Sequence, residues 1–124
     1  MDRVLHLQPA HLSVWELAVA CSRSAAAAAI ECINCAVCYA ACDVVEMNPK
    51  YLGPAALNRA WTLVNDQRDG GQIERLRAVA GDAGCHNCHS QQGCMTYCPN
   101  ELNPTLSIAG LKRVTATAAL KGKI

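Results

Sequence analysis

One run of cysteines constrains this chain more than any other feature. Between Cys32 and Cys42 the sequence follows the pattern C-x2-C-x2-C-x3-C. Three cysteines at this spacing can surround one cube of iron and sulfur within a tight turn, and the fourth, one helical turn further along, typically binds a second cluster. This first run therefore predicts an iron–sulfur protein with a partner run elsewhere in the chain.

A second run extends from Cys88 to Cys98, displaced by 56 residues from the first, and has Gln91 in place of one cysteine. If each run gives its last cysteine to the other run's cluster, two ligand sets follow. The first set is Cys32, Cys35, Cys38 and Cys98, which suits a [4Fe–4S] cluster. The second set is Cys42, Cys88 and Cys94. Because Gln91 leaves one corner without a thiolate, this set predicts a [3Fe–4S] cluster.

The remaining cysteines leave alternatives open. Cys85 lies three residues before Cys88 and would complete a second [4Fe–4S] set if it were a ligand; otherwise it is a spare thiol. Cys21 is expected to be an ordinary small buried residue. The odd count of nine cysteines and the recurring C-x2-C pairs favour reduced, metal-binding thiols over disulfides. Structural zinc is disfavoured because the run holds more thiols than one tetrahedral ion binds.

The composition limits the core and the partners. Hydrophobic residues make up 52% of the 124 residues, aromatic residues only 4%, and phenylalanine is absent. We expect one domain whose modest core is built from small and aliphatic side chains. The net charge is +1 and the basic residues are scattered, so we expect no nucleic-acid partner. The longest apolar stretches are too short to span a bilayer.

Helical periodicity dominates the rest of the chain. A capping box at residues 13–16 and an alanine-rich stretch predict a helix ending near Ile30, after an irregular lead-in. Residues 54–66 and 73–80 have amphipathic helical patterns, and another helix should begin at Asn103-Pro104. Its inner face would hold Ile108, Leu111, Ala118 and either Val114 or Thr115. We expect an all-α fold of two small helical halves, related by a pseudo-two-fold around two iron–sulfur clusters.

Residues 31–118 resemble the iron–sulfur subunit of succinate dehydrogenase and fumarate reductase. The likeness rests on both cysteine runs, on the segments 48–57 and 66–69, and on Cys98-Pro99 through Asn103-Pro104. It implies that residues 31–124 form a C-terminal α-helical ferredoxin domain with [4Fe–4S] and [3Fe–4S] clusters, preceded by a poorly matched segment, 1–30. It also implies electron transfer between a flavoprotein subunit and quinone bound by a membrane anchor subunit. Such a complex interconverts succinate and fumarate, as in the tricarboxylic acid cycle.

The resemblance also implies a location and two residues near the quinone. The subunit would lie at the cytoplasmic face of the membrane, peripherally through its partner subunits, and this chain alone would perform no substrate chemistry. His89 matches a residue beside the three-iron cluster and the quinone, and Lys112 a lysine near the quinone headgroup. A solvated or capping histidine and a lysine extended along the last helix are the alternatives.

Some positions depart from the family pattern. Asp43 replaces a proline, and Met47 replaces a tryptophan that lines the ubiquinone pocket in many succinate dehydrogenases. The first run is more similar to that of menaquinone-using fumarate reductases. No segment before Cys32 resembles the family's [2Fe–2S] domain with its C-x4-C-x2-C pattern, so we expect that centre on a separate chain, or a truncated product.

Two other functions remain open. One is a dicluster subunit of a heterodisulfide-reductase-like or anaerobic glycerol-3-phosphate dehydrogenase-like complex. Such subunits normally have a complete second cysteine set, so the role of Cys85 discriminates this alternative. The other is a zinc-stabilised interaction module or a non-functional fragment, for which a redox-silent protein holding stoichiometric zinc would be evidence.

Overall fold

The structure, a computed structural model, describes residues 26–124. The predictions for residues 1–25, including the lead-in, the capping box and Cys21, lie outside this range. The described part of the chain is helical and contains no strand, which confirms the all-α prediction. Residues 26–30 are helical. They are followed by α2 (Val37–Ala40), α3 (Asp43–Met47), α4 (Gly53–Val64), α5 (Gln72–Ala80), the 3₁₀ helix η1 (Cys85–Asn87), α6 (Gly93–Thr96) and α7 (Pro104–Leu120).

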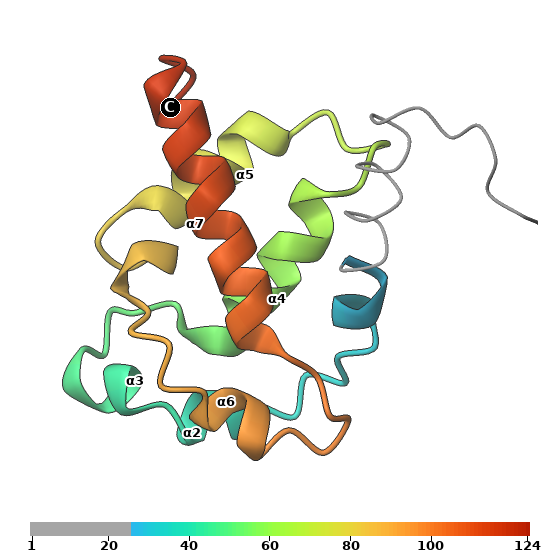
Figure 1. Ribbon diagram of the computed structural model, residues 1–124, viewed down its shortest axis with the longest axis vertical. Coiled ribbons are helices and arrows are strands. Elements are labelled where there is room, and N and C mark those ends of the chain that lie inside the picture. The colour runs from blue at the N-terminus through green and yellow to red at the C-terminus, as the bar shows by residue number, and fades with distance from the viewer. Residues whose placement is uncertain (1–25) are drawn as a thin grey trace, which may run out of the picture.

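Helices α4, α5 and α7 enclose most of the core. α7 crosses α4, and α5 packs against both (Figure 1). As predicted, the apolar residues Leu57, Trp61 and Val64 of α4 are buried. The ring of Trp61 lies against Gly110 of α7, where an added Cβ would come within 2.5 Å of the indole. A residue with no side chain at position 110 therefore lets the two helices approach closely.

The inner face of α7 agrees with the sequence pattern. Ile108, Leu111 and Ala118 are buried. At the position where two residues were possible, Thr115 is buried and Val114 is only partly buried. The helix begins with Pro104, and the side chain of Asn103 accepts a hydrogen bond from the backbone N–H of Leu106 at 3.0 Å.

The two cysteine runs have the same backbone conformation. Asn34 and Ser90 have φ angles of 58° and 59°, and Ala36 and Gln92 have φ angles of 61° and 67°. The members of each pair are 56 residues apart, as are the two runs. In each run the second left-handed residue precedes a four-residue helix, α2 in the first run and α6 in the second. The internal repeat is thus a repeat of backbone shape as well as of cysteine spacing.

The two helical halves also correspond in their packing. α2 packs on α4 and α6 packs on α7, and across the two halves α2 contacts α6 and α4 contacts α7. The short helices α2 and α6 lie together at one end of the long helices (Figure 1). The sequence did not predict α3, which follows Cys42 directly. Within residues 26–124, no helix is both long enough and apolar enough to cross a membrane.

Candidate iron–sulfur sites

A first cavity brings together thiols from both cysteine runs. It is lined by Cys32, Cys35 and Cys38 of the first run and by Cys98, the last cysteine of the second. Most of its other lining residues are apolar, including Ile33, Ala36, Ala55, Pro99, Leu102 and Pro104. The four thiols predicted to form one ligand set therefore surround one cavity.

In a second cavity most of the thiols come from the second run and one comes from the first. It is lined by Cys88 and Cys94 of the second run, by Cys42 of the first, and by Gln91. Its wall is more polar than that of the first cavity, with His89, Ser90, Gln92, Tyr51 and Thr105. The structure therefore brings the three predicted thiols of the second set together, and the glutamine of the incomplete run lies beside them.

Hydrogen-bond donors point at the sulfur atoms in both cavities. The backbone N–H of Ser90 lies 3.4 Å from Sγ of Cys88, and that of Leu102 lies 3.4 Å from Sγ of Cys98. The hydroxyl of Thr105 lies 3.3 Å from Sγ of Cys94. Left-handed residues within a loop, such as those in each run, turn backbone N–H groups into a concavity that binds anions, including iron–sulfur clusters. The donor sets and the loops fit such clusters.

Burial affects the ionisation of the thiols. Burial, together with the neighbouring charge of Cys32, raises the pKa of Cys38 to about 11. Burial also raises the pKa of Cys94, although the hydroxyl of Thr105 acts in the opposite direction. These thiols are therefore protonated at neutral pH when no metal is bound. Because only thiolates ligate iron, loading of either site must release protons.

Two asparagines fix the segment that leads into the first run. The buried side chain of Asn58 on α4 donates to the carbonyl of Ala29 at 3.1 Å and accepts from the hydroxyl of Ser107 at 2.8 Å. Asn100, two residues after the second run, donates to the carbonyl of Glu31 at 2.8 Å. Both halves of the chain thus hold the start of the first run.

In the part of the chain that the structure describes, no three His, Cys, Asp or Glu side chains converge closely enough to hold a single metal ion.

Comparison with known families agrees with this arrangement. Residues 31–103 match the model of the 4Fe-4S dicluster domain. The chain belongs to this family. Iron–sulfur clusters are therefore the cofactors of this dicluster domain, and its role is electron transfer.

Curated relatives of the dicluster domain include proteins named fumarate reductase iron-sulfur subunit. The Mycobacterium tuberculosis protein is 39% identical over 90 residues, which are 73% of this chain and 36% of the relative. The Haemophilus influenzae protein is 39% identical over 77 residues, which are 62% of this chain and 30% of the relative. An Escherichia coli protein is 38% identical over 77 residues, or 62% of this chain and 32% of the relative. The resemblance to this class of subunit is confirmed, and the chain spans about a third of the length of these relatives.

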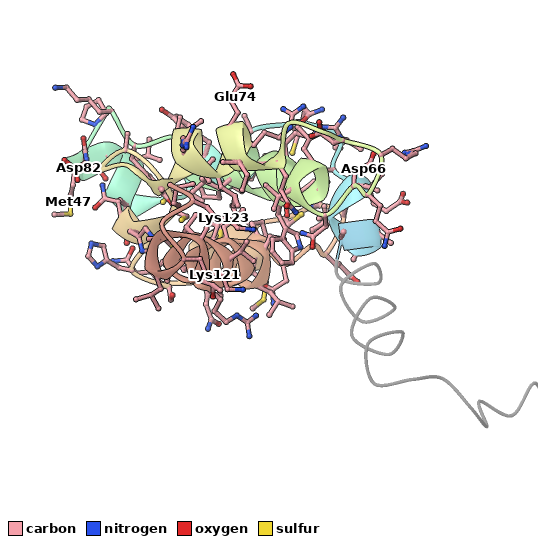
Figure 2. The ribbon with its side chains drawn as sticks, turned by 90° about the horizontal axis from the view of Figure 1, so that it is seen from above. Met47, Asp66, Glu74, Asp82, Lys121 and Lys123 are labelled. Carbon is pink, nitrogen blue, oxygen red and sulfur yellow. The ribbon has the colours of Figure 1, made fainter. Side chains whose placement is uncertain are left out.

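The structure also places the other positions that the sequence singles out in the dicluster domain. Cys85 is fully buried in the core, with its Sγ 3.7 Å from the hydroxyl of Thr115, and lines neither cavity. His89 is exposed and lies in the wall of the second cavity. Lys112 on α7 donates from Nζ to the carbonyl of Cys88 at 2.6 Å. Met47 is 84% exposed and projects from the edge of the molecule (Figure 2).

Tyr51 lines the dicluster domain's second cavity, although no motif in the sequence indicates a role for it. The residue is 2% exposed, and burial, together with the nearby thiols of Cys88, Cys42 and Cys94, raises its pKa well above the usual range for tyrosine. The phenol therefore stays protonated and able to donate a hydrogen bond. One signal was present in the sequence: Tyr51 is one of only three tyrosines, and it follows the Asn48-Pro49 turn.

Proposed function

We propose that this chain is the electron-transfer iron–sulfur subunit of a succinate:quinone oxidoreductase, of the fumarate reductase or succinate dehydrogenase type. The observation that carries the proposal is the exchange of cysteines between the two runs. The last cysteine of each run, Cys42 or Cys98, lies in the cavity of the other run. Two cysteine-lined sites in one small domain, held on neighbouring short helices, suit a relay that passes electrons from one site to the next.

We assign a [4Fe–4S] cluster to the first cavity and a [3Fe–4S] cluster to the second. The full set of four thiols supports the first assignment. Gln91 in the wall of the second cavity supports the other, as does the burial of Cys85 in the core beside Thr115. When bound, such clusters take up and release single electrons. Cys32, Cys35, Cys38 and Cys98 would hold the first cluster, and Cys42, Cys88 and Cys94 the second.

The protein's own groups would control these sites in different ways. The wall of the first cavity is mostly apolar, and the backbone N–H of Leu102 is the donor that lies near one of its thiols. The second cavity supplies more donors, from Ser90, Thr105 and Tyr51. Hydrogen bonds to the sulfur atoms favour the more negative, reduced state, so the second site would hold an electron more firmly.

The proposed partners come from the names of the relatives and from the cysteine pattern. A fumarate reductase or succinate dehydrogenase would supply a flavoprotein subunit, a membrane anchor subunit and quinone, with the chain lying peripherally at the cytoplasmic face of the membrane. A further [2Fe–2S] centre would lie in a separate domain or chain. On this proposal His89, in the wall of the second cavity, and Lys112, bonded to Cys88, are the residues nearest the quinone.

Electron paramagnetic resonance of the protein, reconstituted anaerobically and measured oxidised and then reduced, tests the cluster types. We expect a sharp signal in the oxidised sample and about seven iron atoms per chain, one four-iron and one three-iron centre. About eight iron atoms with a silent oxidised state would contradict the three-iron assignment. A colourless protein with stoichiometric zinc would contradict an iron–sulfur role altogether.

Cysteine variants test the exchange between the runs. Cys98→Ser should damage the first cluster, although Cys98 lies in the second run, and Cys42→Ser should damage the second. The matched control is Cys85→Ala, because Cys85 lines neither cavity, and this variant should retain both signals. Loss of only the three-iron signal in Cys98→Ser would overturn the crossed arrangement.

The parent complex requires a separate test. The chain, tagged and recovered from the membranes of its own cells, should bring with it a flavoprotein that interconverts succinate and fumarate. In the Cys98→Ser variant the same preparation should lose electron transfer between succinate and quinone while the flavoprotein still reduces a soluble dye. Recovery with a different redox partner would favour another dicluster complex.

A further inference from the structure

The hydroxyl of Tyr51 lacks a partner in an otherwise satisfied interior. Among residues 26–124 it is the one buried side-chain oxygen or nitrogen atom that makes no hydrogen bond. Buried polar groups nearly always find a partner, because an unsatisfied one costs about 1 to 3 kcal/mol. An unpaired phenol in a wall that also holds Cys42, Cys88 and Cys94 therefore indicates a missing acceptor in the second cavity.

The backbone fixes where this hydroxyl can reach. The N–H of Tyr51 donates to the carbonyl of Asn48 at 2.9 Å, and the N–H of Leu52 donates to the carbonyl of Ala83 at 2.8 Å. These bonds hold the tyrosine between the first run and the loop that leads into the second. Because a tyrosine has only two side-chain torsions and this one is fully enclosed, the hydroxyl has little freedom to turn elsewhere.

Resting on the proposed function, we infer that Tyr51 donates a hydrogen bond from its hydroxyl to a sulfur atom at the second site and so raises the reduction potential of the cluster held there. The acceptor is a ligating thiolate or a cluster sulfide. A donor aimed at such a sulfur stabilises the reduced state, which carries the extra negative charge. Tyr51 is thus a positioning and tuning residue, and it ligates no iron itself.

Tyr51→Phe removes the hydroxyl and keeps the ring. In the anaerobically reconstituted full chain, we expect the midpoint potential of the second cluster to become more negative, and that of the first to stay unchanged. For a one-electron centre, a shift of about 59 mV in the midpoint potential changes the oxidised-to-reduced ratio tenfold at a fixed applied potential. Potentials of the loaded fraction do not depend on occupancy, so partial loss of cluster would not obscure the result.

A second readout detects the proton directly. After exchange into heavy water, electron–nuclear double resonance should find several exchangeable deuterons coupled to the second cluster, in whichever oxidation state is paramagnetic, because Ser90 and Thr105 also place exchangeable protons near its sulfur atoms. The coupling that comes from the Tyr51 hydroxyl should disappear in Tyr51→Phe, and the others should remain. The control is Tyr39→Phe, the same change on a tyrosine whose ring packs against Gly53 and which lines neither cavity. It should leave both the potential and the coupling unchanged.

The outcomes separate this inference from the function on which it rests. An unchanged potential in Tyr51→Phe, with every deuteron coupling of the unmodified protein retained, would overturn the inference, since the hydroxyl would then be satisfied by water or another group. It would leave the electron-transfer role intact. A second cluster of the four-iron type would alter only the cluster assignment. A protein that loads no cluster at the second site would overturn both.

Discussion

Nζ of Lys112 lies 2.6 Å from the carbonyl oxygen of Cys88, so the last helix holds the first cysteine of the second run by a charged hydrogen bond. The contact joins residues 24 positions apart and is partly buried. It also keeps a positive charge beside the second cavity. Lys112 therefore has a structural role of its own, whatever its relation to a quinone.

Replacing this lysine should weaken the second site selectively. Lys112→Met keeps much of the side chain's length but removes the charged donor. We expect the free energy of unfolding to fall by roughly 1 to 2 kcal/mol and the second cluster to be lost faster. The electron paramagnetic resonance signal of the second cluster, followed over time during anaerobic incubation, measures this effect. Lys121→Met is the control, because Lys121 is exposed at the end of the same helix (Figure 2). Equal decay in the two variants would contradict the role of the contact.

The contact between Trp61 and Gly110 should tolerate no added carbon. In a helix, Gly→Ala normally stabilises by about 1 kcal/mol, but here the methyl group would lie within 2.5 Å of the indole. We expect Gly110→Ala to destabilise the protein by about 1 to 3 kcal/mol. The midpoint of thermal unfolding of the loaded protein, at a fixed scan rate, measures it. Gly70→Ala, with open space around the added carbon, should change the midpoint little.

At a left-handed residue of the first run we expect the opposite effect, because there a change from alanine to glycine should stabilise the protein. Ala36 has a φ angle of 61°, which is unfavourable for an L-residue with a Cβ. After allowing for the greater freedom of glycine in the unfolded chain, Ala36→Gly should stabilise the protein by about 0.5 to 1 kcal/mol. Ala56→Gly, at an exposed position inside α4, should destabilise it by about 1 kcal/mol. The same unfolding measurement compares the two, and a lower midpoint for Ala36→Gly would contradict the reasoning.

The sequence was most informative where the structure depends on local spacing. The distribution of the cysteines between the two cavities follows from their spacing and from one internal repeat. The buried faces of α4 and α7 follow from the spacing of apolar residues a few positions apart. The roles of Tyr51 and Asn58 could not be predicted in this way. Tyr51 points at the second cavity because Leu52 bonds to Ala83, and Asn58 joins Ala29 to Ser107. Such contacts depend on how distant segments meet, which no periodicity encodes.

The different walls of the two cavities predict different potentials. The second cavity offers hydroxyl and backbone donors close to its thiols, whereas apolar residues dominate the first. Because hydrogen bonds to the sulfur atoms raise the potential, we expect the second cluster to have the higher midpoint. A potentiometric titration followed by electron paramagnetic resonance resolves the two centres. The reverse order would mean that cluster type or net charge outweighs the donors.

Removal of iron should disorder much of the molecule. Each cavity has walls from both halves of the chain, and without a cluster the gathered thiols lose the ligand that joins them. We expect anaerobic chelation to reduce the helical circular dichroism and to broaden the amide proton spectrum, with recovery on reconstitution. Full retention of the helical signal after complete loss of iron would show that the core around Leu57 and Leu111 folds without metal.

The distribution of cysteines between the two cavities also determines what a break in the chain would do. A single cut at Gly70, in the exposed turn between α4 and α5, separates the two runs into different fragments. Neither fragment contains all the thiols of either cavity, since Cys42 stays with one piece and Cys98 with the other. A nicked molecule would therefore keep its two sites only while its fragments remain paired. Mixing separately produced halves would restore both sites together or neither.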